Sequence, residues 1–191
     1  MNKLELRMYG LVPYNISEIQ KGIQYGHAVV EYGQMSKLKG DETLSLYDDW
    51  ADNWKTFMIL NGGTSNHTTG YVGTMESNLE KLKEADITVA EFYEPDLNDM
   101  LSGIVFIVDE RVFNSKDYPD FEDWIIENNS ELLNLKKILY KNLSARKLAR
   151  LVKESDLPKD KEAYEKWVDF IGGEKNVFLK EFLSPRNFRL A

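Results

Sequence analysis

The stretch SEIQKGIQYGHAVVEY, Ser17–Tyr32, follows an apolar run at residues 3–12 across a short Pro-Tyr-Asn turn. The run alternates polar and apolar residues and predicts a strand, whereas the stretch after it has helical spacing. Its small residues Gly22, Gly26 and Ala28 lie near one side, which predicts a helix pressed closely onto a sheet. A strand–helix unit of this kind favours the α/β class.

Strand and helix patterns go on alternating up to Val112. Lys55–Leu60 predicts a strand buried on both faces, and Thr74–Ala85 predicts a helix. Thr88–Tyr93 and Gly103–Val108 predict two more strands, joined by a short acidic turn. We expect an α/β three-layer sandwich with a mostly parallel four-stranded sheet, in which the last strand runs antiparallel.

The second part of the chain has a different composition, with helical apolar faces punctuated by Pro and Gly. We therefore predict two parts, an α/β domain at 1–112 and a helical extension at 113–191 packed on it. We expect residues 184–191, SPRNFRLA, to dock on the body through Phe188 and Leu190. The helices predicted in the extension are 121–128, 130–141, 144–154 and 160–171.

The chain carries a net charge of −8, and its acidic residues gather in the first half. Residues 1–112 hold 9 Lys and Arg against 18 Asp and Glu. This balance disfavours bulk nucleic acid as a partner, because phosphate contacts rest on cationic side chains. No apolar run reaches roughly 18 residues, so we expect no transmembrane helix and no membrane partner. The lack of cysteine excludes disulfides and thiolate metal sites, and we expect neither a metal nor a cofactor.

Polar residues form one stripe along the first predicted helix, at Gln20, Gln24, His27 and Glu31. The imidazole of His27 can orient water or transfer a proton, or it can be hydrogen-bonded at the packing seam of the helix. Gln20 and Gln24 can donate to a carbonyl or phosphate, and the alternative is a pair of half-exposed glutamines. The stripe marks a candidate pocket at the sheet edge.

Three carboxylates, Glu94, Asp96 and Asp99, fall within six residues on the turn after the third predicted strand. Loops at the strand ends of open α/β sheets form crevices, and a carboxylate there can act as a general base. The alternative is that Asp96 and Asp99 cap a short turn. The spacing lacks the glycine and distal glutamate of a calcium loop, so we predict no metal site.

A Gly-rich segment, Asn61-Gly62-Gly63-Thr64, follows the second predicted strand and opens a loop at 61–73. Its backbone N–H groups can cradle a phosphate, although the segment lacks the Gly-Lys-Ser/Thr ending of a P-loop. We expect His67, on the same loop, to face solvent.

The predicted helix at 144–154 carries a basic face. This face can contact an acidic partner or nucleic acid, or it can be a solvated surface that balances the acidic domain. Its members are Arg146, Lys147, Arg150 and Lys153.

Taken together, the first helix and the acidic turn make residues 1–112 resemble the type-two (archaeal and eukaryotic) peptidyl-tRNA hydrolases. In that family the helix after the first strand carries a Lys-x-x-x-Gln-x-Gly-His-Ala pattern, and residues 20–28 here read QKGIQYGHA. Gln20 stands where the family has its catalytic lysine. The residues that match the pattern are Gln24, Gly26, His27 and Ala28.

A later loop of the family, Asp-x-x-x-Thr-Gln-x-x-x-Gly, leads into the last strand, and residues 94–103 here read EPDLNDMLSG. Glu94 stands for the family aspartate, Asn98 stands for the threonine, and Gly103 matches. Phrases such as IQKGIQYGHAVVEY and RNFRLA also resemble a group of uncharacterised tailed-phage proteins. We expect a cytoplasmic location, which is the host cytoplasm if the chain is viral.

The resemblance implies a hydrolase-like protein that directs water at an ester or phosphoester. The crevice expected for this lies between the first helix, the Gly-rich segment and the acidic turn. A small nucleotide or aminoacyl compound is the expected substrate, because the negative charge of the predicted α/β domain disfavours binding of the polyanionic peptidyl-tRNA. The catalytic candidates are Glu94, Asp96 and His27. The candidates for substrate binding are Gln20, Gln24, Asn61, Gly62, Gly63, Thr64, Asn98 and Asp99.

Replacement of the family lysine leaves a second interpretation open. The Gln20 amide cannot supply the positive charge that stabilises a developing oxyanion. The chain can instead be a non-catalytic phage accessory protein that binds or sequesters a nucleotide-like ligand or a host protein. The sequence also leaves open whether the chain forms a homodimer.

Overall fold

The computed structural model describes residues 3–66, 72–128 and 161–191. The chain divides into two compact units. The first unit combines Met1–Glu110 with Phe178–Ala191, and the second unit is Arg111–Val177. None of the helices described in either unit has the length and apolar character needed to cross a membrane.

The first unit is built on a four-stranded mixed sheet with the strand order β2-β1-β4-β3. β1 pairs parallel with β2, while β4 pairs antiparallel with both β1 and β3. The α/β class is confirmed, but the prediction of a mostly parallel sheet is wrong. A short turn joins β3 to β4 and makes them antiparallel neighbours, and β4 then inserts beside β1. The strands are β1 (Leu6–Pro13), β2 (Thr56–Gly63), β3 (Ala90–Glu94) and β4 (Met100–Asp109).

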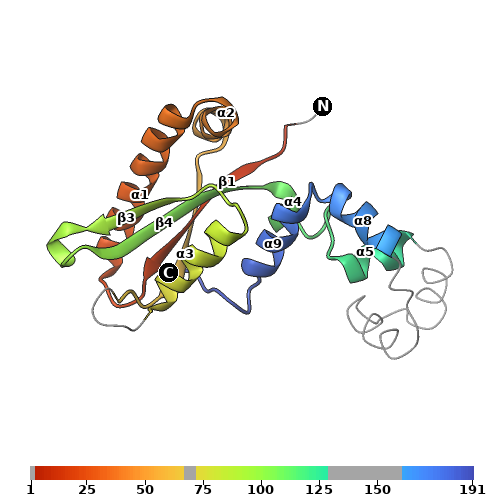
Figure 1. The fold of residues 1–191 in the computed structure, drawn as a ribbon. Coiled ribbons are helices and arrows are strands. Elements are labelled where there is room, and N and C mark those ends of the chain that lie inside the picture. Colours follow the sequence, from red (N-terminus) through yellow and green to blue (C-terminus); the bar gives the residue numbers. More distant parts are fainter. Residues whose placement is uncertain (1–2, 67–71, 129–160) are drawn as a thin grey trace. The chain divides into compact units, whose positions relative to one another are not determined.

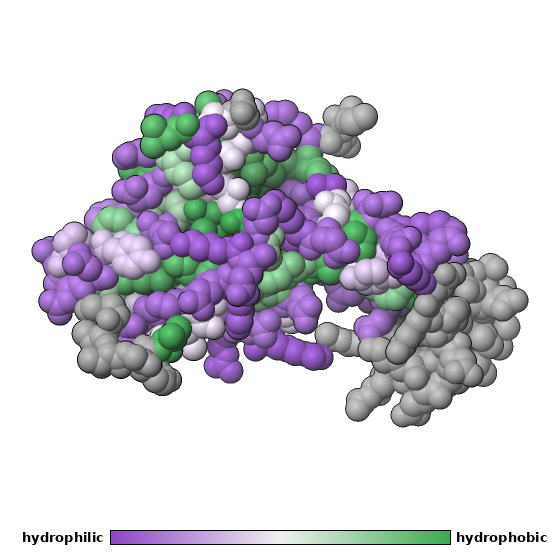
Figure 2. Space-filling model, in the orientation of Figure 1, coloured by the Kyte–Doolittle hydropathy of each residue, from purple (hydrophilic) through white to green (hydrophobic). Residues whose placement is uncertain are grey.

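Helices lie on both sides of this sheet. Figure 1 shows α1 and α2 on one side and α3 on the other. Figure 2 shows hydrophobic residues at the surface in the region of α1 and α2. Leu38, near the end of α1, is exposed. The helical elements are α1 (Glu18–Lys39), α2 (Asp41–Asp49), a π-helical turn (Trp50–Trp54), α3 (Thr74–Glu84), a 3₁₀ turn (Pro95–Leu97) and α9 (Glu174–Phe182), which ends in this unit.

The contact between α1 and the sheet is closest at Gly103 of β4. A Cβ atom on Gly103 would lie 2.8 Å from the backbone oxygen of Gln24 and 2.9 Å from the Cβ atom of Ala28. Ala28 is fully buried there, as the sequence predicts. Gly22 and Gly26 do not serve this contact, because no atom lies within 4 Å of the position of their missing Cβ atoms. The sheet, rather than the helix, supplies the glycine.

Two large aromatic side chains of α1, Tyr25 and Tyr32, are buried in the core beside this contact. The Tyr25 ring lies across Gly10 of β1, and its hydroxyl donates to the Met8 carbonyl oxygen at 2.7 Å. Burial raises the pKa of Tyr25, so the hydroxyl stays protonated and keeps donating. The core on this side consists of Leu6, Met8, Val12, Tyr25, Ala28, Tyr32, Trp50, Ala90, Val105 and Ile107.

β2 lies at an edge of the sheet, and the prediction that it is buried on both faces is wrong. Its Phe57 side chain is 51% exposed. Leu190 pairs antiparallel with Leu60 on the outer side of β2, which confirms that residues 184–191 dock on the body. This pairing covers backbone groups that an edge strand otherwise leaves open.

The described part of the second unit is helical. Trp167 donates its indole N–H to the Pro119 carbonyl oxygen at 3.0 Å, and the Ile126 and Ile171 side chains are fully buried. The predicted helices at 130–141 and 144–154 lie outside the described residues. The helices described are α4 (Glu110–Phe113), which begins at the unit boundary, α5 (Phe121–Asn128) and α8 (Lys161–Phe170).

The close contact at Gly103 predicts that a larger side chain at this position lowers the stability of the protein. Gly103→Ala places a methyl group against the backbone of α1, which cannot move aside without displacing the helix. We expect a loss of about 1–3 kcal/mol in the free energy of unfolding, measured by urea denaturation. Gly22→Ala is the matched control, because its Cβ points into open space and alanine favours a helix. Equal stability of Gly103→Ala and the unmodified chain would contradict this packing.

Candidate functional site

The first helix and the acidic turn meet in one hydrogen-bonded network. Gln24 of α1 is only 4% exposed, and its side-chain amide donates to a Glu94 carboxylate oxygen at 2.5 Å. The Ser102 hydroxyl, also buried, donates to the Gln24 amide oxygen at 2.9 Å. Both ends of the amide are therefore satisfied. The network joins α1 to the end of β3 and the beginning of β4.

His27 lies beside this network but takes no hydrogen bond among the described residues. Its ring is exposed and meets the Phe92 ring edge-on, with the ring centroids 4.6 Å apart. His27 is therefore not a hydrogen-bonded histidine at the packing seam of the helix, which was one of the two interpretations of the sequence. The exposed imidazole lies one turn from Gln24 on α1.

Gln20 has a structural explanation that the sequence analysis missed. Its side-chain oxygen accepts from the Ser17 backbone N–H at 3.2 Å, and its own N–H donates to the Ser17 hydroxyl at 3.3 Å. This reciprocal pair is a capping box that starts α1. The Ser-x-x-Gln spacing at 17–20 was the available signal. Gln20 thus has a capping role at the beginning of α1.

The carboxylates of the acidic turn do not converge. Glu94 points to α1 and also accepts from the Asp96 backbone N–H at 3.3 Å. Asp96 is exposed, and Asn98 and Asp99 are exposed turn residues in the left-handed conformation, each with φ of 55°. Short polar side chains tolerate that conformation, which explains their presence there. Among the residues described, no group of three or more His, Asp or Glu side chains is placed to hold a metal ion.

Tyr93, next to Glu94, stays protonated. Burial, followed by the hydrogen bond to Glu91, raises the pKa of Tyr93 to about 12. The hydroxyl donates to a Glu91 carboxylate oxygen at 3.0 Å. Tyr93 is therefore not an acid or base at neutral pH.

The Gly-rich segment lies away from this network. Asn61, Gly62 and Gly63 belong to β2 rather than to a loop, and β2 and β3 form opposite edges of the sheet. Three strand spacings, about 14 Å, separate the two edges. The Gly-rich segment therefore does not join α1 and the acidic turn as the predicted single crevice requires, and the cleft that it lines contains no residue of either. The antiparallel insertion of β4 between β1 and β3 is the reason.

The backbone of the segment is also engaged internally. The N–H groups of Asn61, Gly63 and Thr64 donate to the Arg189 carbonyl, the Asn61 side chain and the Thr74 hydroxyl. A Cβ atom on Gly62 would collide with the Met75 sulfur, and one on Gly63 with Thr74. The glycines let β2 approach α3, so a phosphate cradle from these N–H groups is not supported.

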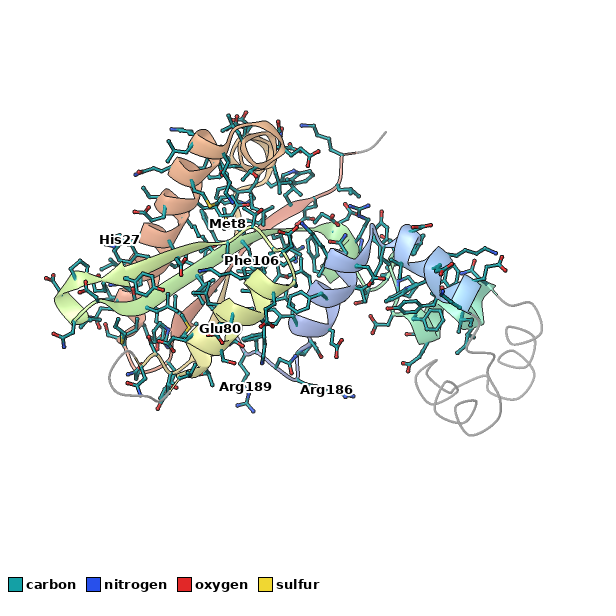
Figure 3. All side chains as sticks on the ribbon, in the orientation of Figure 1. Met8, His27, Glu80, Phe106, Arg186 and Arg189 are labelled. Carbon is teal, nitrogen blue, oxygen red and sulfur yellow. The ribbon has the colours of Figure 1, made fainter. Side chains whose placement is uncertain are left out.

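A basic cleft instead lies where β2, α3 and residues 182–189 meet. Its volume is about 590 Å³. Figure 3 shows Arg186 and Arg189 on the side of the sheet that carries α3, away from His27. The lining residues are Asn61, Gly62, Gly63, Thr74, Ser77, Asn78, Lys81, Phe182, Arg186, Asn187, Phe188 and Arg189.

The cations of the basic cleft form no ion pair within the described part of the chain. Lys81, Arg186 and Arg189 are exposed, and none of them enters an ion pair with the other described residues. The amides of Asn78 and Asn187, by contrast, already donate to backbone carbonyl oxygens. Three unpaired cations around one concavity attract an anion.

Sequence reasoning did not place these three cations at a site. The available signal was Arg-x-x-Arg around an aromatic residue, at 186–189, within a segment expected to dock. His67 and the basic face of the 144–154 helix (Arg146, Lys147, Arg150 and Lys153) lie outside the described residues.

No protein-family model matches this chain, and comparison with curated proteins finds no match. The function proposed below is therefore inferred from the residues and their geometry.

Removal of one member of the Gln24 network should destabilise the protein. Ser102→Ala leaves the Gln24 amide oxygen buried without its donor, and such a loss costs about 1–3 kcal/mol. We expect that decrease in the free energy of unfolding by urea denaturation. Ser45→Ala, at an exposed position of α2, is the matched control and should stay within about 0.5 kcal/mol of the unmodified chain. Equal effects of the two substitutions would show that the network is not closed in solution.

Proposed function

We propose that the first unit is a three-layer sandwich that binds a small phosphorylated, nucleotide-like ligand in the basic cleft. The observation that carries this proposal is a set of three cations around one concavity, none of them ion-paired with another described residue, in a chain with a net charge of −8. Its volume of about 590 Å³ falls within the range of small-molecule sites. A local basic site in an acidic chain selects for an anion small enough to avoid the surrounding carboxylates.

The cation types suit phosphate groups. The guanidinium groups of Arg186 and Arg189 can each take two phosphate oxygens, whereas the Lys81 ammonium acts as a compact charge on the opposite wall. Because these groups come from α3 and from residues 186–189, a bound phosphate would bridge the two walls. Two or three cations match the charge of a di- or triphosphate better than that of a single carboxylate.

An aromatic wall supports a nucleotide over inorganic phosphate. Phe188 lines the cleft, and its ring centroid lies 5.1 Å from that of Phe182. A base stacked on an aromatic side chain contributes about 1–3 kcal/mol and needs no particular base identity. In this function the protein sequesters its ligand as an accessory factor, in the host cytoplasm if it comes from a phage.

Hydrolysis of the peptidyl-tRNA-hydrolase type is a second candidate, favoured by the Gln24–Glu94 hydrogen bond. In that reaction Glu94, or Asp96, accepts a proton from water while the water oxygen attacks a carbonyl carbon or phosphorus. The proton that the carboxylate accepted then passes to the leaving oxygen, directly or through the exposed His27 side chain, which contacts Phe92 of β3. This chemistry uses the β3 edge, so substitutions in the basic cleft separate it from the first candidate.

Charge reversal tests the binding proposal. We expect calorimetric titration with ATP to detect binding, and the double substitution Arg186→Glu/Arg189→Glu to weaken it at least about tenfold, since each lost charge-assisted contact is worth about 1.5–3 kcal/mol. Lys37→Glu/Lys39→Glu changes the net charge equally on α1 and is the matched control. Absence of ATP binding, or equal loss in the control, would refute the proposal.

Mass spectrometry decides between binding and turnover. Long incubation of the purified protein with a mixture of nucleotides and aminoacyl esters should return the ligands unaltered. Recovery of cleaved products that disappear in Glu94→Gln, but persist in Arg186→Glu/Arg189→Glu, would instead establish the hydrolytic candidate at the β3 edge.

A further inference from the structure

We infer that residues 184–191 form a strap, and that docking of this strap on β2 is coupled to ligand binding in the basic cleft. The inference rests on the proposed function and adds a regulation of the same site. The Asn61 N–H donates to the Arg189 carbonyl oxygen at 2.9 Å, and the Ala191 N–H donates to the Ile59 carbonyl oxygen at 3.0 Å. These two bonds frame the single bridge between Leu60 and Leu190.

The strap is held by the two backbone bonds to β2, by the Asn187 amide, which donates to the Glu181 and Phe182 carbonyl oxygens of α9, and by one apolar contact. The Leu190 side chain is 72% exposed, and both arginines are exposed as well. Phe188 is the apolar anchor, through its ring contact with Phe182. Segments with little buried apolar surface and few backbone hydrogen bonds open locally at a small cost, well below that of global unfolding. The strap therefore belongs to the part of the unit that opens most readily.

The strap also supplies a wall of the cleft. Arg186, Asn187, Phe188 and Arg189 all line it, and they include two of its three cations and the aromatic surface. Arg189 takes part both in strap docking and in the cleft. Its carbonyl oxygen accepts from the Asn61 N–H of β2, and the residue also lines the cleft. The complete cleft exists only while the strap is docked. A ligand that binds the docked form suppresses opening by a factor of 1 + [L]/Kd.

Hydrogen exchange measures this coupling at a single backbone group. The Asn61 N–H is released when the strap opens, so its exchange reports opening. We expect ATP at ten times its Kd to slow this exchange about tenfold. The Lys55 N–H, bonded to the Trp50 carbonyl oxygen in the same unit, is the internal control and should not change.

A pair of proline variants tests the strap without altering a residue that lines the cleft. Ala191→Pro removes the donor to Ile59, and we expect Asn61 exchange to become about fivefold faster, the equivalent of one typical net hydrogen bond. Added ATP should reverse the change. Leu190→Pro is the matched control, because the Leu190 N–H donates to no described residue.

The outcomes are distinguishable. Slower Asn61 exchange with ATP, together with the effect of Ala191→Pro, supports the coupling. Binding of ATP by calorimetry with unchanged Asn61 exchange overturns the strap inference and leaves the proposed function standing. Failure of ATP to bind overturns both.

Discussion

The close approach of α1 to β4 at Gly103 is the constraint on which the first unit depends. A helix this near the strand buries the Gln24 amide beneath it. A buried amide must be hydrogen-bonded at both ends, and Ser102 and Glu94 provide those bonds. The same approach requires a small residue at Ala28 on the helix, whose Cβ atom faces Gly103. One missing Cβ atom thus determines the helix position, the network and the orientation of Glu94.

Local patterns in the sequence were enough to predict elements but not their order in space. The strand–helix unit at the beginning, α3 and the antiparallel last strand all follow from periodicity and a short connection. The order of the strands in a sheet depends on tertiary packing. No residue pattern predicted that β4 lies between β1 and β3. For that reason the expected convergence of α1 with the acidic turn occurs, while the Gly-rich segment is found at the other edge.

The candidate site illustrates the same limit. Gly62 and Gly63 have the composition of an anion cradle, yet their lack of side chains serves the approach of β2 to α3. Lys81 and Arg186 are far apart in the sequence, and only the docking of residues 184–191 places them around one cleft. The net negative charge led us to expect no long polyanion as a partner, and it concealed a small basic region. Charge averaged over a chain says little about the potential within one concavity.

A structure of the protein crystallised with ATP tests the account most directly. The account predicts electron density for the phosphates among Lys81, Arg186 and Arg189, with the base against the Phe188 ring and the strap docked on β2. Density for the nucleotide at the Glu94 edge, with the basic cleft empty of ligand, would contradict it.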